Sequence, residues 1–280
     1  MEIQILRNAT TLLSFGEHRL LVDPMLSEVG AQPGFKMVGG GRRRNPLVPL
    51  PPGTDALLSS VTGVIVTHEH PDHLDVPAVR WIKERELPVW ANGIDAANLK
   101  RKGLDVHELE DGSLGMTVET IPSRHGRGLV GWLMGPVAGY YLAPADEPSL
   151  YVTGDSVLTD AVLAAVDRLK PDIILAPAGA ANMGFGGDIL FSVDELVTLI
   201  GHAPGKVVLN HLEALDHCPT TRTGLRERMH TEGLADRVFV PEDGEISSFD
   251  APTIREPVQT RATADEPGFQ KWLTAKFAGT

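Results

Sequence analysis

The residues most suited to chemistry lie in one short stretch, THEHPDH at residues 67–73. Within six positions it holds three histidines and an aspartate: His68, His70, Asp72 and His73. His68 and His70 are two apart on extended chain, so their side chains point the same way, and Pro71 then turns the chain. Imidazole and carboxylate suit zinc, and also iron or manganese. The spacing therefore predicts a metal site built from two pairs of ligands.

Three further stretches carry candidate ligands, and each follows a predicted strand. They are residues 123–126 with His125, residues 153–156 with Asp155, and residues 209–211 with His211. Junctions between a strand and a loop are where sites are commonly built on a rigid scaffold. A solvated polar turn with chance histidines is the alternative interpretation of the first stretch, but it predicts no matching ligands elsewhere.

Taken together, these residues resemble the metallo-β-lactamase-fold hydrolases. THEHPDH matches the H-x-H-x-D-H signature of that family, and the later ligands follow in the family's order. The resemblance covers roughly residues 1–250, which we expect to form one domain. It implies an α+β fold, an αββα four-layer sandwich in which two facing mixed β-sheets are covered by outer helices. The dinuclear site would lie at one edge of the sheets.

The resemblance also implies a role for each ligand. The first divalent cation would be held by His68, His70 and His125, the second by Asp72, His73 and His211, and Asp155 would bridge them. Zinc is the first expectation, with manganese or iron as alternatives. A hydroxide held between the two cations would be the nucleophile. Asp72 and Asp155 are therefore candidate catalytic residues, and so is His217, which could donate a proton to the leaving group or be structural.

Several short motifs narrow the resemblance further. RNAT, LLVDPML, RNPLV, NHLEALDHC and PEDGE resemble the branch that includes L-ascorbate-6-phosphate lactonase. This branch implies hydrolysis of a small, anionic ester or lactone. Two alternatives stay open: a phosphodiesterase acting on small phosphate esters, and a non-catalytic binding module that keeps the metals.

A basic cluster stands in the long segment 24–53, which six glycines and six prolines interrupt. A segment of this length without periodicity is typical of a lid or binding loop. Its arginines, Arg42, Arg43 and Arg44, are candidate substrate-binding residues because guanidinium groups bind phosphate or carboxylate in bidentate fashion. Arg222 is a fourth candidate, since it begins a predicted helix after the last ligand. A solvated surface is the alternative for all four.

The remaining composition limits the class of protein. The formal net charge is −12, which argues against nucleic acid or an anionic membrane as a partner and favours a small-molecule substrate. Cys218 is the one cysteine, which fits a reducing compartment, and we expect a cytoplasmic protein. Residues 251–280 suggest a C-terminal strap and a short helix, either packed on the body or on a second subunit of a homo-oligomer.

The elements that must position the ligands are short. Apolar runs predict strands on both sides of a turn at Gly16 and Glu17, and then at 61–67, 87–91, 114–121, 129–134, 137–143, 149–153, 171–179, 206–211 and twice within 238–249. Helices are expected at 76–86, 95–103, 156–171, 192–201 and 221–233. Asp75 is a predicted N-cap, and we also expect it to orient a ligand histidine.

Overall fold

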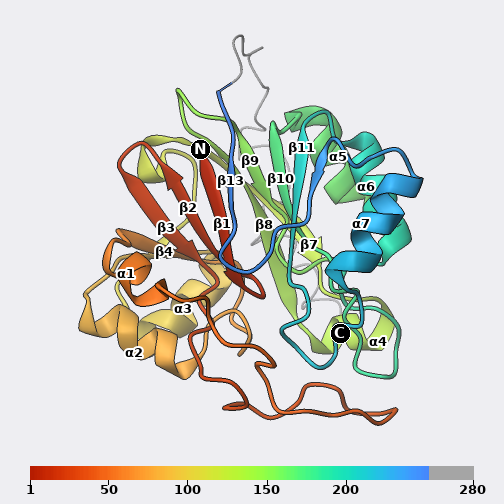
Figure 1. The fold of residues 1–280 in the computed structure, drawn as a ribbon. Coiled ribbons are helices and arrows are strands. Elements are labelled where there is room, and N and C mark those ends of the chain that lie inside the picture. Colours follow the sequence, from red (N-terminus) through yellow and green to blue (C-terminus); the bar gives the residue numbers. More distant parts are fainter. Residues whose placement is uncertain (252–280) are drawn as a thin grey trace, which may run out of the picture.

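Two mixed β-sheets face each other and carry helices on their outer surfaces, as the computed structural model shows for residues 1–251 (Figure 1). The first sheet has the order β13 (Ile246–Ser248), β1 (Glu2–Arg7), β2 (Thr10–Phe15), β3 (His18–Val22), β4 (Gly63–Val66), β5 (Val89–Ala91) and β6 (Val106–Glu108). The second has the order β12 (Val238–Phe239), β11 (Lys206–Asn210), β10 (Ile173–Pro177), β9 (Leu150–Val152), β8 (Pro136–Ala143) and β7 (Thr117–Arg124). The predicted αββα sandwich is confirmed.

Strand direction decides where the functional loops emerge. In the first sheet β3, β4, β5 and β6 run parallel, and in the second sheet β9, β10, β11 and β12 do. β7 pairs antiparallel with β8, which pairs antiparallel with β9, so β7 and β9 also point the same way. Parallel strands end at the same edge of a sheet. The loops that follow β3, β4, β7, β9 and β11 therefore meet at one end of the molecule.

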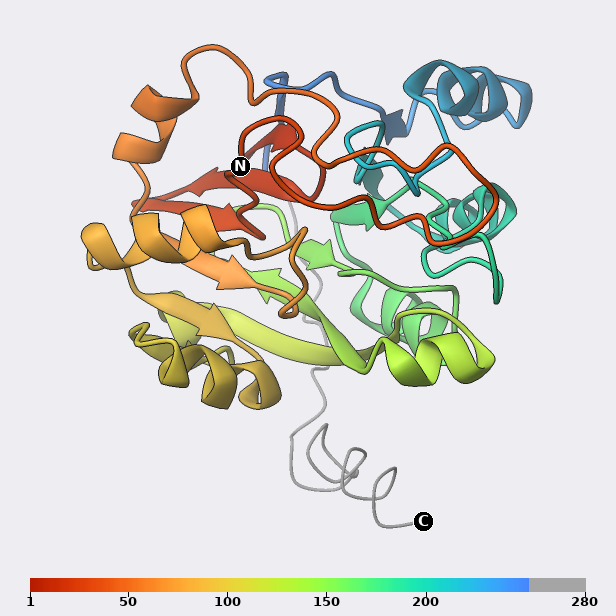
Figure 2. The same cartoon turned by 90° about the horizontal axis from the view of Figure 1, so that it is seen from below.

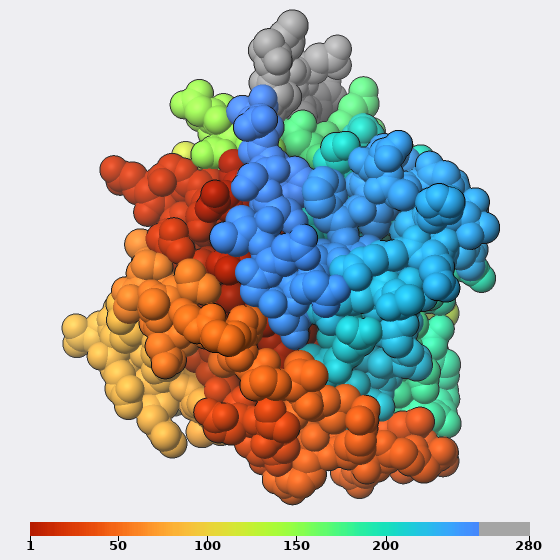
Figure 3. Space-filling view, in the orientation of Figure 1, coloured from red at the N-terminus to blue at the C-terminus, as the bar shows by residue number. Residues whose placement is uncertain are grey.

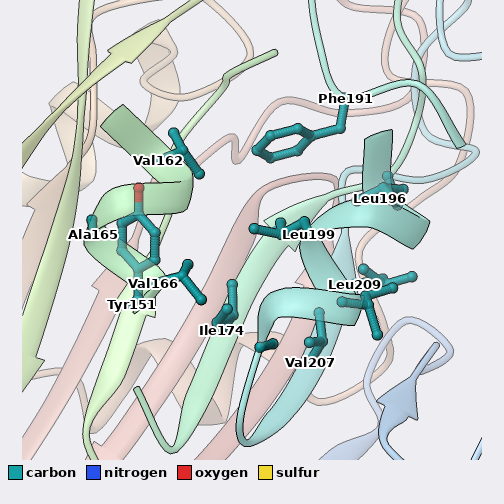
Figure 4. Close-up of a cluster of buried hydrophobic side chains, with 14 of the residues drawn as sticks. Tyr151, Val162, Ala165, Val166, Ile174, Phe191, Leu196, Leu199, Val207 and Leu209 are labelled. Carbon is teal, nitrogen blue, oxygen red and sulfur yellow. The ribbon is translucent and has the colours of Figure 1, made fainter. Parts of the chain in front are cut away.

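Apolar side chains fill three layers. The layer between the sheets includes Ile5, Val22, Tyr140, Leu175 and Val208. A second layer lies under the helices of the first sheet, α1 (Thr54–Ser59), α2 (Val76–Glu84) and α3 (Gly93–Arg101). The third lies between the second sheet and α5 (Asp160–Leu169), α6 (Val193–His202) and α7 (Arg222–Thr231), where Figure 4 shows Tyr151, Phe191 and their neighbours. These layers make a rigid frame for the loops at the sheet edge.

The helix starts follow the expected capping chemistry. The side chain of Asp75 accepts from the Ala78 N–H at 2.9 Å, and Ser192 and Glu195 form the predicted capping box of α6. The helix expected from residue 156 begins only at Asp160, because Thr159 is its N-cap. The strands at 87–91, 137–143 and 206–211 and the two last short strands are confirmed within a few residues.

One predicted strand is wrong. Residues 129–134 fall mostly within a short helix, α4 (Gly128–Leu133), although LVGWLM reads as an apolar strand. Gly126 and Gly128, with φ of 96° and 55°, turn the chain sharply after β7. Gly131 then packs against the Gly126 carbonyl, where a Cβ would lie only 2.3 Å from the oxygen. α1, β6 and a 3₁₀ turn at Ser113–Gly115 were not predicted.

The segment 24–53 contains neither helix nor extended strand and crosses the end of the molecule where the loops meet (Figure 2). The space-filling view shows it in red-orange to orange along the lower end (Figure 3). A two-residue bridge joins Gln32 to Asn45. The carboxylate of Asp216 accepts from the N–H groups of Phe35 and Arg43 at 2.8 and 3.1 Å. The segment is thus attached to the chain next to His217.

Among residues 1–251, no helix has the length and apolar character needed to cross a bilayer. The predicted strap and short helix at 251–280 fall almost wholly outside the described residues.

Candidate metal centre

All seven predicted ligands come together where the loops after β4, β7, β9 and β11 meet. Their candidate ligand atoms form two groups, within each of which the atoms lie no more than 4.8 Å apart. The first group is His68, His70 and His125, and the second is Asp72, His73, Asp155 and His211. All are buried except His70, which is half-buried. This grouping agrees with the two ligand sets that the sequence resemblance implies.

Asp155 lies between the two groups. Its Oδ2 atom is 3.1 Å from Nε2 of His73 and 3.6 Å from Nε2 of His211, both in the second group. The same oxygen is 3.4 Å from Nε2 of His125 in the first group. Of the second group, Asp72 is also close to His211, with its Oδ2 3.4 Å from Nε2. A carboxylate in this position can contact a cation in either group.

Hydrogen bonds at Nδ1 orient three of the histidines so that the other ring nitrogen, Nε2, points toward the two ligand groups. His73 donates from Nδ1 to Asp23 at 2.9 Å, and His125 donates to the Ile189 carbonyl at 2.8 Å. The Thr67 hydroxyl donates to Asp23 at 2.7 Å, so it accepts from Nδ1 of His68 at 3.0 Å. Each Nε2 then keeps a free lone pair. Partners of this kind fix the tautomer and orientation of metal-binding histidines.

The donor set fits divalent cations. The Nε2 atoms of His73 and His211 are buried and have no hydrogen-bond partner among the described residues. Nε2 of His68 also faces Nδ1 of His70 at 3.0 Å, a contact that needs a proton or a cation to relieve it. Nitrogen and carboxylate oxygen donors at this density suit zinc, manganese or iron.

The charges are arranged to hold cations. Burial is the largest influence on the Asp155 carboxyl and raises its pKa, but His73 and His211 together lower that pKa well below the ordinary value. Burial lowers the pKa of His125 to about 4 and that of His68 well below its usual range. For His73 and His211, burial is outweighed by the neighbouring carboxylates, Asp155 first, which raise the pKa well above the ordinary value. A bound cation would take the place of the protons on these two imidazoles. Neutral imidazoles and ionised carboxylates are the forms that bind metal.

Asn8, the second residue of the RNAT motif, joins the loops that carry the second group, a role that no local pattern predicts. Its side chain donates from Nδ2 to the Asp72 carbonyl at 3.0 Å, and its own carbonyl accepts from the His211 N–H at 2.9 Å. Asn8 is buried in the turn between β1 and β2, with φ of 57°. Asparagine tolerates this left-handed conformation better than most residues. One residue of the first sheet thus positions ligand loops from both sheets.

Comparison with known proteins settles the family. The family model described as "Beta-lactamase superfamily domain" matches residues 18–212. The chain belongs to this superfamily. It is 32% identical over 255 residues to the UPF0173 protein YddR of Bacillus subtilis, covering 89% of this chain and all of that protein. A UPF0173 metal-dependent hydrolase of Alkaliphilus metalliredigens is 25% identical over 217 residues, which cover 75% of this chain and 83% of that protein.

Two solved structures of similar sequence have the same fold as this beta-lactamase superfamily member. An isothiocyanate hydrolase from Delia radicum gut bacteria superposes with a TM-score of 0.82 at 30% identity, over 90% of this chain and all of that one. A possible metal-dependent hydrolase from Veillonella parvula gives 0.82 at 31% identity, over 89% and 99% of the two chains. The narrower likeness to L-ascorbate-6-phosphate lactonase remains a prediction.

Asp75, the carboxylate expected to orient a ligand histidine, has other partners. Asp75 contacts no ligand histidine: besides capping α2 it accepts from Ser27 at 2.6 Å, so that prediction is wrong. Asp23 is the carboxylate that orients a ligand histidine. It accepts hydrogen bonds from His73 and from Thr67, although it lies 50 residues before His73 and 44 before Thr67 in the chain. Its place at the end of β3, beside β4, follows from the parallel pairing of these strands. The pairing was not predicted from the sequence.

His217 lies beside the second ligand group of the superfamily site. Its ring centre is 6.4 Å from that of His211, and its Nδ1 is buried without a hydrogen-bond partner among the described residues. Burial lowers the pKa of His217, so the imidazole is neutral near pH 7. The neighbouring Cys218 is buried with Sγ 3.5 Å from Nδ1 of His211. A proton-transfer role for His217 stays a prediction that this location permits.

Three of the four candidate arginines, Arg42, Arg44 and Arg222, make side-chain contacts within the protein, whereas Arg43 is attached through its backbone N–H to Asp216. Arg42 and Arg44 donate to the carbonyls of Gly34 and Ala31 in their own loop, at 3.0 and 2.8 Å. Arg222 is buried and binds the carboxylates of Glu213 and Asp243. These contacts favour a structural role, and substrate binding by Arg42, Arg43, Arg44 or Arg222 stays a prediction.

Proposed function

We propose that this chain is a dinuclear metal-dependent hydrolase of small molecules. The observation that carries the proposal is the buried set of imidazoles and carboxylates whose bare donor atoms converge in two adjacent groups. Membership of the beta-lactamase superfamily supports it, and so do the names of two relatives, one called a metal-dependent hydrolase and the other a possible metal-dependent hydrolase.

Each residue of the site has a defined task under this proposal. When bound, two divalent cations supply Lewis acidity and lower the pKa of water to about 7. His68, His70 and His125 would hold one cation, Asp72, His73 and His211 would hold the other, and Asp155 would be within reach of both. Asp23 and Thr67 keep the imidazoles oriented. His217 is neutral, so it would first take a proton from the attacking water and then pass that proton to the leaving group; its buried Nδ1 has no hydrogen-bond partner among the described residues.

The reacting group we propose first is the carbonyl of an ester or lactone. A second candidate is an isothiocyanate, which water converts to an amine and carbonyl sulfide. The similarity to the isothiocyanate hydrolase over 90% of this chain favours that candidate. In both reactions water adds to an electrophilic carbon, so one site suits either. A phosphodiester is a third possibility.

A substrate panel tests the proposal. Protein purified without chelator and supplemented with zinc or manganese is assayed with an aryl ester, a γ-lactone, bis(4-nitrophenyl) phosphate and an aryl isothiocyanate. We expect turnover of one class, which Asp155→Ala and His68→Ala abolish. Two bound metals with no turnover of any class would instead favour a non-catalytic binding module.

A further inference from the structure

Exposed apolar side chains are concentrated on one part of the surface. Within residues 1–251, nine large apolar residues are prominently exposed, and six of these lie on three segments. They are Met37 and Val38 of the long loop, Leu129, Trp132 and Leu133 of α4, and Phe185 of the loop after β10. We call these six residues the apolar rim. Their exposed fractions, from 44% to 71%, are unusual for side chains of this kind on a chain with so much charge.

The three segments of the apolar rim touch one another. The N–H groups of Met37 and Val38 both donate to the Met183 carbonyl, at 3.0 and 3.2 Å. A Cβ on Gly184 would lie 2.1 Å from the Val38 carbonyl oxygen, and one on Gly186 would lie 2.2 Å from Val130 of α4. Only glycine permits approaches this close. The three segments that carry the apolar rim therefore pack against one another, although they come from distant parts of the chain.

This surface borders the candidate metal centre. α4 begins three residues after His125, and the backbone of Met134, just after α4, interacts with the ring of His70. On the other side, the ring of Phe35 stands edge-on to His217 with 5.4 Å between centres. The N–H of Asn182 donates to the His217 carbonyl at 3.0 Å. Both His70, the most exposed ligand, and His217 are thus flanked by segments that carry the apolar rim.

The residues packed under the apolar rim are also apolar. A buried cluster lies there, made of Met25, Val130, Ala181, Ile189, Leu190, Leu215 and Cys218, with Phe35, Met134 and Met183 packed against it. The nearby guanidinium groups of Arg42 and Arg44 are engaged with loop carbonyls. The approach to the ligands therefore offers apolar contacts, and two of the three loop arginines are already engaged within the loop.

We infer that the apolar rim binds the organic part of the substrate, which is an uncharged aryl or alkyl group, and that Trp132 and Phe185 determine specificity. This inference rests on the proposed function, because it assigns the substrate class of the same site. Sites for small molecules are commonly lined by apolar and aromatic side chains beside a few polar groups. Burying a phenyl ring against such a surface is worth at least about tenfold in affinity.

Matched substrates test the inference. Metal-loaded wild-type protein is assayed with phenyl acetate against 4-carboxyphenyl acetate, and with phenyl isothiocyanate against its 4-carboxy analogue. The rim variant is Trp132→Ser with Phe185→Ser. The control variant is Val76→Ser with Ile246→Ser, two exposed apolar residues outside the apolar rim. We expect the phenyl compound to be preferred and its KM to rise at least about fivefold in the rim variant alone. Turnover number and metal content should be unchanged.

A binding measurement separates failure of this inference from failure of the proposed hydrolase activity. Acetophenone and 4-acetylbenzoate cannot be hydrolysed, and titration calorimetry reports their Kd directly. Weaker binding of acetophenone by the rim variant supports the inference even if no substrate of the panel is turned over. Preference for the carboxylated compounds would overturn it and favour the arginines of the long loop. A dimer that the rim variant dissociates, with KM and Kd unchanged, would overturn it and identify the surface as a contact between two copies of the chain.

Discussion

At the scale of single residues, orientation of the ligands depends on groups that do not themselves bind metal. Asp23 accepts three hydrogen bonds, from the Thr67 N–H, the Thr67 hydroxyl and Nδ1 of His73. Its φ of 49° lies in the left-handed region, and so do the φ angles of the nearby Asn8 and His211. Strained backbone of this kind persists where the surroundings determine it strongly, and it is common at functional sites.

We expect Asp23→Ala to weaken metal binding by roughly 10- to 100-fold, the usual effect of removing a group that orients a ligand histidine. His73 would lose the acceptor that fixes its tautomer, and the Thr67 N–H would be left unpaired. Competition with a chromophoric chelator measures the affinity. Asp105→Ala, an exposed aspartate, is the control. Unchanged metal affinity in Asp23→Ala would contradict the role assigned to this carboxylate.

Asp155→Ala should lose more than Asp23→Ala, because Asp155 is the residue placed between the two ligand groups. We expect fewer than two metal ions per chain by elemental analysis and at least about a 100-fold loss of activity, equivalent to about 2.7 kcal/mol of transition-state stabilisation. The circular dichroism spectrum should remain that of the folded protein. A fully active variant with both metals would show that another residue bridges the ions.

At the scale of elements, the first turn of α3 contains a buried carboxyl group. Asp95 accepts a hydrogen bond from Asn92, the N-cap of α3, at 2.5 Å. Burial raises the pKa of Asp95 to about 6. The unfolded chain has an aspartate pKa of about 3.9, so the folded state holds this proton more tightly.

The free energy of unfolding should therefore fall as the pH rises from about 4 to about 6, and it should stay at the lower value at higher pH. Asp95→Asn removes the charge while keeping the shape, and should raise the free energy of unfolding at pH 7.5 by up to about 3 kcal/mol. At pH 4 the variant and the wild type should be nearly equal. Urea unfolding at both values measures the difference, with Asp160→Asn at the exposed start of α5 as control. An equal effect of Asp95→Asn at both pH values would count against this pKa.

The elements also show where prediction from sequence succeeds. The strand before His68 was predicted from its run of buried β-branched residues, and the capping box of α6 from Ser192 and Glu195, because both signals are local. The helix at Gly128–Leu133 was missed because three of its four large apolar residues face outward and only Val130 is buried, which a rule based on burial does not anticipate. The contact of Asp23 with His73 depends on strand pairing across 50 residues, and no local pattern encodes it.

At the scale of the whole molecule, the candidate centre connects the two sheets. The loop after β4 of the first sheet supplies four ligands, and the loops after β7, β9 and β11 of the second supply three. Ions bound there would link the sheets at one end, while the apolar layer between them holds the rest. Binding to the folded state alone stabilises it by mass action.

We expect removal of the metals with a chelator to lower Tm by roughly 10 °C, because binding at a thousand times Kd contributes about 4 kcal/mol and each kcal/mol shifts a chain of this size by about 2–4 °C. Adding zinc or manganese back should restore the original value. Differential scanning calorimetry measures both. Asp155→Ala should respond less to the chelator, and a Tm that is the same with and without chelator would contradict a metal link between the sheets.

The pairing of β1 with β13 has a consequence for the order in which the protein is made. β1 begins at Glu2 and its partner ends at Ser248, so the first sheet gains its last strand only after nearly all of the described chain has left the ribosome. Until then one edge of β1 has no partner strand, and an unpaired edge can form hydrogen bonds with the wrong strand. The candidate ligands also appear in a fixed order along the chain. The first group is complete once His125 has been added, and the second group is complete only once His211 has been added. Under the proposed ligand assignment, a chain interrupted before residue 211 would therefore carry all three candidate ligands of the first group but an incomplete second group.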